Sequence, residues 1–433
     1  QEPFWKVPEE IFSNLKVRAS YGSLGNGNID PYSFQELFKI KQSSLVLNGI
    51  RPQYTGQPAV IPLGLTWEKS TTLNLGLDFA FLSNRLQFSG DIYQRKTTDM
   101  FTVGMSLPAV FGTDVPKGNY ADLTTKGFEL SVSWRDQFQL ASKPFNYEVR
   151  FTLADYQSTI DKYNNPEKKL GDDYYYEGMK VGEIWGYETE GFFTSQADID
   201  SHAKQPYFYA GATAGQWLPG DIKFKDLNGD GVIDYGNNTV DNPGDLKIIG
   251  NSEPRFIYGI NLSGDWNNFF VSAFFQGVGK QDWWPGSEAS YFWGMYNRPY
   301  NDMPKSHLGN IWTEENPNTY FPRLRGYSSE EPYAELNLKQ TRYLQNIAYI
   351  RMKNIQLGYT LPKSFISKLR MQNAKVYVSG ENLWSWSPFY KYSKDLDVEA
   401  VRGSDRDLTE GTSGNGYSYP ILKSVSFGLS VTF

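Results

Sequence analysis

The sequence contains no cysteine and only two histidines among its 433 residues. Without cysteine the chain has no disulfide, no thiolate metal site and no cysteine nucleophile, although this absence does not identify the compartment. Long apolar runs are also missing, because none approaches the roughly 18 residues that a transmembrane helix needs. The formal net charge is −6, from 42 lysines and arginines against 48 aspartates and glutamates. This balance disfavours a nucleic-acid partner.

Alternating apolar residues are the dominant pattern in what is present. The C-terminal segment has an apolar residue at every second position from Val425 to Phe433, with small or polar residues between them. In the segment 342–361 the apolar phase slips near Asn354, which predicts a β-bulge. A period of two gives each strand one apolar and one polar face. Together with the C-terminal segment and 342–361, the pattern predicts ten strands, the others lying near 15–21, 73–81, 86–92, 128–134, 147–153, 258–262, 269–275 and 374–378.

The polar faces and the connections distinguish a membrane barrel from a soluble β-sandwich. Short connections alternate with long ones, as the periplasmic turns and outside loops of outer-membrane barrels do. The short ones are expected at 82–85, 136–144, 265–268 and 362–373, and the long ones at 22–69, 97–123, 158–253, 277–341 and 381–419. The polar faces carry charges beside small residues, as a wet lumen would: Lys16, Arg18, Asp78, Asp91, Glu148 and Arg150.

The fold class predicted from these patterns is all-β, an antiparallel transmembrane β-barrel. Because a barrel has no free edges, the last strand would then be its closing strand, paired with the first strand of the barrel, with the apolar residues from Val425 to Phe433 facing lipid. Tryptophans at the expected strand ends would form an aromatic girdle: Trp134, Trp266, Trp384 and Trp386. The remaining alternative is a soluble β protein with its apolar face inward.

Several stretches, in order along nearly the whole chain, carry a family resemblance. They are LKVRASYGSLGNGNI (15–29), LTWEKSTTLNLGLDFAFLSNRLQFSGDIYQRKTTDM (65–100), NYADLTTKGFELSVSW (119–134), GEIWGYETEGFF (182–193), PGDIKFKDLNGDGVID (219–234), IIGNSEPRFIYGINL (248–262), IRMKNIQLGYTLP (350–362), VYVSGENLWSWS (376–387) and the C-terminal tail. On these segments the chain resembles the SusC/RagA family of TonB-dependent outer-membrane transporters of Bacteroidetes.

The resemblance implies an architecture larger than this chain. Members of the family have a 22-stranded barrel, an N-terminal plug domain inside it and a TonB box. Residues 1–433 are therefore expected to form the C-terminal part of such a barrel, with about ten of its strands and with long extracellular loops. The plug domain and the TonB box are not expected in this chain.

The resemblance also implies a function and a location. Family members import oligosaccharides, or oligopeptides, across the outer membrane of a Gram-negative bacterium. The TonB complex supplies the energy by acting on the plug, and a SusD-like surface lipoprotein covers the barrel as a lid. The expected protein is thus a transporter in outer-membrane lipid and not an enzyme. The alternatives are a passive porin or siderophore receptor and, more remotely, a soluble glycan-binding protein or glycosidase.

One motif in the long connection 158–253 predicts a metal site. Asp226, Asn228, Asp230, Val232 and Asp234 fit the pattern D-x-N-x-D-G-x-x-D, in which alternate side chains and the Val232 carbonyl converge on one Ca²⁺. The twelfth position is an asparagine instead of the usual bidentate glutamate, which departs from the EF-hand pattern.

Two alternatives stay open for this motif. Asp241 or Asp245 could supply the carboxylate that the twelfth position lacks, and the expected ion is then structural. In the other reading the segment is a metal-free loop of turns closed by its own side chains.

An aromatic segment, DWWPGSEASYFWGMY (282–296), is the candidate substrate contact. Flat aromatic rings with polar edges suit sugar faces or peptide side chains, which gives Trp283, Trp284, Tyr291 and Trp293 as candidate binding residues. Packing of this loop on itself, or against the lid protein, is the alternative. Catalytic motifs are absent: there is no G-x-S-x-G elbow, and the expected role of His202 and His307 is that of loop histidines.

Overall fold

The computed structural model describes residues 8, 11–27, 35–56, 58, 60–61, 64–104, 110, 115–171, 174–206, 216–287, 289–326, 334–401, 416 and 419–433. Within these residues, no helix is both long enough and apolar enough to span a membrane.

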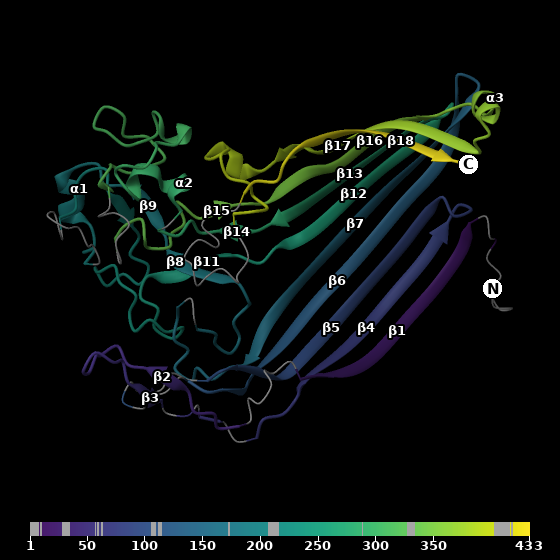
Figure 1. Cartoon of the computed structure of the whole chain (residues 1–433). Coiled ribbons are helices and arrows are strands. Elements are labelled where there is room, and N and C mark those ends of the chain that lie inside the picture. The colour runs from purple at the N-terminus through teal and green to yellow at the C-terminus, as the bar shows by residue number, and fades with distance from the viewer. Residues whose placement is uncertain are drawn as a thin grey trace.

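Ten long strands form one antiparallel sheet that curves like a section of a barrel wall (Figure 1). Each strand is hydrogen-bonded to the next long strand along the chain, which confirms the ten predicted strands. In the described part of the chain β1 and β18 have a partner on one side only, so the sheet is open. The strands are β1 (Phe12–Asn26), β4 (Glu68–Phe81), β5 (Leu86–Val103), β6 (Lys117–Leu140), β7 (Lys143–Lys162), β12 (Arg255–Trp266), β13 (Phe269–Lys280), β16 (Tyr349–Thr360), β17 (Asn373–Trp386) and β18 (Ser424–Thr432).

Three details of the predicted strands are decided by backbone pairing. The bulge expected near Asn354 is present, because the register with both neighbouring strands shifts there. The connections expected at 97–123 and 136–144 are shorter, since β5, β6 and β7 continue into them. Trp134 consequently lies within β6 and not at its end. The ladder continues past the apolar residues because backbone hydrogen bonding does not depend on which side chains face the lipid.

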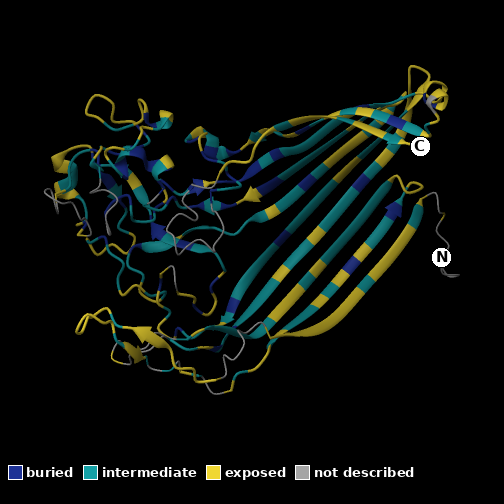
Figure 2. Ribbon diagram, viewed as in Figure 1, coloured by how far each residue is buried: buried dark blue, intermediate teal, exposed yellow. Residues whose placement is uncertain are grey.

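One face of the wall is apolar and exposed. Cross-strand partners point to the same side of a sheet, so the register identifies a row of residues that crosses the wall: Val17, Leu77, Gly90, Leu130, Leu153, Tyr258, Gly277, Ile350 and Trp386. Figure 2 shows exposed segments recurring along the strands, most continuously on β1. In β18 the side chains of Phe427 and Leu429 are 84% and 66% exposed. This is the face that the alternating pattern predicts for lipid contact.

The opposite face of the wall is polar and held together by ion pairs. Arg18 on β1 donates to Asp78 on β4, with Nε 2.8 Å from Oδ2, and to Asp91 on β5, with Nη2 2.7 Å from Oδ2. Its guanidinium crosses Gly76, where an added Cβ would lie 2.6 Å from the Arg18 Cζ. A glycine on the middle strand therefore lets one arginine connect three strands.

The short elements lie mostly at one end of the wall, whereas α3, the start of β1 and the end of β18 lie at the other (Figure 1). The small strands form four two-stranded sheets: β2 (Ile40–Gln42) with β3 (Gln53–Thr55), β8 (Glu183–Tyr187) with β11 (Leu246–Asn251), β9 (Thr189–Phe192) with β10 (Ile222–Phe224), and β14 (Asp282–Trp283) with β15 (Gln345–Asn346). The helices are α1 (Gln196–Ser201), α2 (Ser290–Trp293), η2 (Gly294–Tyr296), η3 (Lys305–His307), α3 (Lys363–Ile366), η5 (Ser367–Leu369) and η6 (Pro388–Lys391).

The end of the wall that carries α3 has tight turns. Asn267 and Asn268 join β12 to β13 with φ angles of 48° and 71°. Both angles lie in the left-handed region that asparagine tolerates better than most residues, as a two-residue hairpin requires. Long connections at one end and short turns at the other thus agree with the predicted alternation.

A hydrophobic core fills the loops at the other end, and we call these packed loops the loop body. Its largest fully buried side chains include Trp293, Tyr296 and Tyr343, each with no exposed surface. Phe292 and Trp293 of α2 pack edge to face, with ring centroids 4.8 Å apart. The loop body is thus a packed structure and not a set of independent loops.

Candidate functional site

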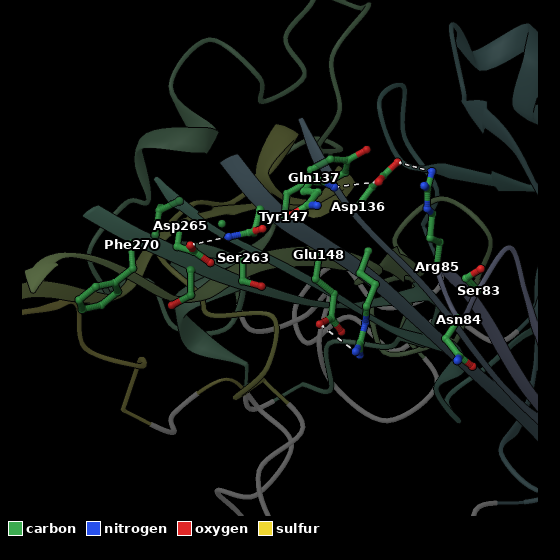
Figure 3. Close-up of a pocket in the computed structure, with 15 residues that line it drawn as sticks. Ser83, Asn84, Arg85, Asp136, Gln137, Tyr147, Glu148, Ser263, Asp265 and Phe270 are labelled. Atoms are coloured by element: carbon green, nitrogen blue, oxygen red, sulfur yellow. Dashed lines mark hydrogen bonds and ion pairs between the residues drawn. The ribbon is translucent and has the colours of Figure 1, made fainter. Parts of the chain in front are cut away.

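The inner face of the wall contains a polar groove of about 690 Å³ near the short turns. Figure 3 shows its charged side chains, which come from neighbouring strands. Nη2 of Arg135 on β6 lies 3.7 Å from Oε2 of Glu148 on β7, and Nη2 of Arg150, beside the groove, lies 2.8 Å from Oε1 of the same Glu148. Because these residues are solvated and alternate in sign, the groove is a wet, polarised surface. This is the lumen-like character predicted for Glu148 and Arg150.

The aromatic segment predicted to contact substrate divides into buried and exposed residues. Trp283 on β14 and Trp293 on α2 are in the loop-body core, with 4% and 0% of their surface exposed. Nε1 of Trp293 donates to the Gly286 carbonyl at 3.0 Å. Trp284 packs against the same core, whereas Tyr291 is exposed. The buried tryptophans offer no surface to a ligand in this structure, because ring burial in the core competes with ligand contact. Tyr291 alone of the four keeps a largely exposed ring.

An ion pair locks two distant parts of the loop body together. Nε of Arg325 donates to Oδ1 of Asp221 at 2.7 Å, and both side chains are almost fully shielded from solvent. Glu335 lies beside them and accepts a hydrogen bond from the Ile222 backbone at 2.8 Å. Burial raises the pKa of Glu335 well above its ordinary value. Arg325, Asp221 and Glu335 therefore have a structural role in the interior of the loop body.

A second cavity, of about 460 Å³, opens on the loop body and is lined by aromatic rings. It is formed by the segment after β7, by β8 and β11, by the residues after Asp234, and by the segment 337–339. Its aromatic lining is Tyr174, Tyr176, Trp185, Tyr187 and Tyr235. We call this the aromatic cavity.

Polar groups lie among the rings of the aromatic cavity. Glu183, Asn238 and Lys339 are part of its lining. The Tyr176 hydroxyl donates to Oε2 of Glu183 at 2.5 Å, and Nδ2 of Asn238 donates to the Leu170 carbonyl at 2.9 Å. These bonds fix both the carboxylate and the amide in position. Aromatic walls with a few positioned polar groups are the usual make-up of a small-ligand site.

Sequence analysis did not identify this cavity as a site. The available signal was the tyrosine run 174–176, followed within ten residues by Trp185 on a short strand. That signal is local, whereas the cavity also needs Tyr235 and Lys339, which only the folded loop body brings near.

The segment predicted to bind calcium folds as consecutive tight turns. The Asp226 carboxylate accepts hydrogen bonds from the backbone N–H groups of Gly229 at 2.6 Å and Gly231 at 2.9 Å. The bond from Gly231 is the main reason why the pKa of Asp226 lies below its ordinary value. Asn228 and Asp230 each accept from the residue two positions further on. The turns are thus closed by the same side chains that the motif assigns to the ion.

Asp245, one of two residues considered for the missing carboxylate, has a different place. It is fully buried, and its oxygens accept from the backbone N–H groups of Leu227 at 2.7 Å and Asp234 at 2.9 Å. Because both oxygens are engaged with backbone donors, Asp245 supports the turns from inside. Oδ1 of Asp234 accepts from Gly236 at 2.7 Å.

The oxygen atoms of the motif are the kind of ligand that a hard cation such as Ca²⁺ prefers. Their positions in this structure match a binding site only in part. Asp226 and Asp230 retain spare lone pairs, since a carboxylate can accept about four hydrogen bonds, and the carbonyl oxygen of the Asn228 side chain has two lone pairs of its own. Within the described ranges, no group of three or more acidic, histidine or cysteine side chains is arranged to hold a metal. Binding would require the Asn228 amide and the Val232 carbonyl to complete the set, as the motif predicts. The calcium site stays a prediction.

Comparison with known proteins identifies the family. The model of the TonB dependent receptor-like β-barrel family matches residues 5–383. TonB-dependent receptors P3 and P26 of Formosa agariphila are 27% and 28% identical, each over 99% of this chain and 41% of the relative. TonB-dependent receptor SusC of Bacteroides thetaiotaomicron is 24% identical over 99% of this chain and 39% of its own length. The chain thus spans about two fifths of the length of the curated relatives it matches.

Solved structures show the same fold. The structure of the RagAB peptide transporter superposes with a TM-score of 0.72 at 20% identity, covering 100% of this chain and 42% of the matched chain. The closed-closed state of the RagAB peptide importer gives a TM-score of 0.69 at 19% identity, with 98% and 41% covered. An open ten-stranded section with one apolar face is what part of such a barrel wall looks like. The chain therefore belongs to the TonB-dependent receptor-like β-barrel family of outer-membrane transporters, which are not enzymes.

Proposed function

We propose that this chain is part of the wall of an active importer that carries oligosaccharides across the outer membrane. The observation that favours sugars is the aromatic cavity, in which ring faces lie beside fixed polar groups. Sugars present apolar C–H faces together with many hydroxyls, so a ligand of this class uses both kinds of contact. Glu183 can accept hydrogen bonds from hydroxyls, whereas Lys339 can donate them. Oligopeptides are the competing substrate class and are distinguished by the experiment below.

The proposal extends to parts of the protein that lie outside this chain. The remaining length of the relatives is proposed to supply the other wall strands, a plug and a TonB box, through which the TonB complex delivers energy. A SusD-like surface lipoprotein is proposed to dock on the loop body as a lid. Tyr291, exposed on the aromatic segment, is the candidate from that segment for contact with substrate or lid.

A structural Ca²⁺ in the loop 226–234 is a further part of the proposal. Tyr235 and Asn238 follow this loop directly and line the aromatic cavity. Asp226, Asn228, Asp230, the Val232 carbonyl and Asp234 would hold the ion, whose role would be to fix the loop and not to take part in transport chemistry. Binding of the ion would then order one wall of the cavity.

The experiment is uptake by a deletion strain that carries the full-length gene or its variants, with labelled oligosaccharides and labelled oligopeptides as separate probes. Replacing both Trp185 and Tyr235 by alanine is expected to raise the sugar concentration for half-maximal uptake roughly tenfold or more, since truncating a central aromatic contact costs about 2 kcal/mol. Tyr54→Ala, at an exposed tyrosine on β3, is the matched control and should leave uptake unchanged.

Three outcomes would contradict parts of this proposal. Uptake of peptides but not of sugars would replace the substrate class. Sugar uptake that is equal in the double variant and in the control would remove the aromatic cavity from the pathway. Uptake that persists in a strain without TonB would indicate a passive porin.

A further inference from the structure

Three lysines form a diagonal row on the outward face of the wall. They are Lys69 on β4, Lys96 on β5 and Lys126 on β6, and all three are exposed. Lys69 pairs with Thr98, two residues from Lys96, and Lys96 pairs with Thr124, two residues from Lys126. Diagonal neighbours on adjacent strands lie about 7–8 Å apart. Their ammonium groups can therefore reach one ligand together.

The outward apolar side chains of the wall form a band across its strands, which we call the apolar band. The row lies beyond the edge of this band that is nearer to the long connections. On β6 the last outward apolar residue is Phe128, and Lys126 is the next outward position. On β4 and β5 the last outward apolar residues are Leu73 and Ile92, and the lysines lie two outward positions further on. Because the band ends at the limit of the hydrocarbon, these ammonium groups lie at the depth of the lipid headgroups.

Three acidic side chains in this region have other partners. Asp161 accepts a hydrogen bond from the Thr124 hydroxyl, and Asp122 accepts one from the Asp99 backbone at 2.9 Å. Asp155, further down β7, forms an ion pair with Arg255. In the described part of the chain none of the three lysines has an acidic partner within ion-pair distance.

The location of the row also argues against a merely solvated surface. The chain as a whole is acidic, with a formal net charge of −6, so three exposed lysines on adjacent strands are not a consequence of composition. Their stems extend from the apolar band, an arrangement in which the methylene groups lie along acyl chains and the ammonium groups reach the interface. Charge and position together select a ligand that is both apolar and anionic.

We propose that Lys69, Lys96 and Lys126 bind the phosphate of a phosphorylated glycolipid in the outer leaflet. The acyl chains of this lipid lie along the apolar face below the row, around Leu73, Ile92 and Phe128. The ammonium groups neutralise the phosphate at the interface, where each lysine contributes roughly fivefold to affinity. This lipid contact fixes the orientation of β4, β5 and β6 in the membrane and is independent of the imported nutrient.

The test uses the full-length transporter purified in neutral detergent, with lipid A, enzymatically dephosphorylated lipid A and inorganic phosphate as probes. Binding is measured by native mass spectrometry and by the shift in melting temperature. Wild-type protein is expected to bind phosphorylated lipid A, and the variant with all three lysines replaced by glutamine should bind it roughly 100-fold more weakly. The difference should shrink at high salt, since exposed charges are screened.

The matched control removes three exposed lysines elsewhere, by Lys305→Gln, Lys363→Gln and Lys368→Gln, and should bind lipid A like wild type. Lys96→Glu alone is a second variant at the centre of the row, expected to weaken binding at least as much as one neutral substitution. Equal affinity for dephosphorylated lipid A, or equal binding by the row variant and the control, would overturn the proposal. An equal shift in melting temperature with inorganic phosphate alone, at the same concentration, would show a phosphate site without a lipid and would also overturn the proposal.

Discussion

Arg325 donates from Nε to Oδ1 of Asp221 at 2.7 Å, in a buried ion pair that connects residues 104 positions apart in the sequence. The side chains of Arg325 and Asp221 are 5% and 0% exposed, and Glu335 is the adjacent buried acid. Breaking such a pair by removing one partner leaves an uncompensated buried charge, which costs about 3–5 kcal/mol.

Replacing Arg325 by methionine is therefore expected to destabilise the loop body while leaving the wall intact. In limited proteolysis of the full-length protein in detergent, the loops of the variant should be cut at a lower protease concentration than those of wild type. The folded barrel, seen as a band in electrophoresis of unheated samples, should be unchanged. The double variant Arg325→Met, Asp221→Asn removes both charges and should recover part of the loss. A double variant less stable than the single one would contradict the buried-charge explanation.

His307 gives the loop body a dependence on pH. Burial lowers the pKa of His307 to about 4, and Nε2 donates to the Phe292 carbonyl at 2.9 Å. In the unfolded chain the pKa is about 6.5. The unfolded state therefore binds more protons between these values, so the stabilising contribution is fully present above about pH 6.5 and is lost as the pH falls through 4.

The size of this loss is about 3 kcal/mol between pH 6.5 and pH 4, at about 1.4 kcal/mol for each pKa unit. It should be visible as faster proteolysis of the loops at low pH. In His307→Gln the amide can still donate a hydrogen bond but does not titrate, so the variant should show a flatter pH profile. A profile as steep as that of wild type would assign the acid sensitivity to other groups.

Leu429 on β18 tests the orientation of the last strand. Its side chain is exposed on the apolar face, opposite Val376 on β17. Leu429→Arg is expected to cost about 2–4 kcal/mol if the residue lies near the middle of the membrane. Ser426→Arg places the same charge on the polar face three residues away and should cost much less. Unfolding in urea from lipid vesicles measures both, and equal losses would contradict the assignment of the faces.

Calcium binding is tested at Asp226 and Asp230. If the predicted ion is present, millimolar calcium should slow proteolysis within the loop 226–234 of the wild-type protein, and the variant Asp226→Ala, Asp230→Ala should lose that protection. The variant should also bind the lid lipoprotein more weakly, with the wall still folded. Glu177→Ala, at an exposed acid in the same connection but outside the motif, is the control. Protection that is independent of calcium in wild type would support the metal-free turns.

Asp245 separates the two explanations of loop order. Because its carboxylate accepts from the backbone of Leu227 and Asp234, Asp245→Ala should loosen the loop whether or not calcium is bound. The cost of leaving buried N–H groups unpaired is about 1–3 kcal/mol for each group. Proteolysis unchanged in this variant would show that the turns do not depend on the buried carboxylate.

The wall was predictable because its signal is local. A strand repeats every two residues, so the alternation from Val425 to Phe433 identifies a two-faced strand without knowledge of its neighbours. Even the bulge near Asn354 was visible as a change of phase. Strand ends were less accurate, since the ladder in β5, β6 and β7 continues where the apolar pattern has stopped.

The sequence by itself thus determined the ten strands, their two faces and the alternation of short turns with long connections. Only the tertiary structure decided that Trp283 and Trp293 are core residues, and that Tyr235 and Lys339 share a cavity with Trp185. Burial in a loop depends on contacts between segments far apart in the chain, and no local period encodes them. An aromatic ring fills a core as readily as it contacts a ligand, so composition alone could not separate the two roles.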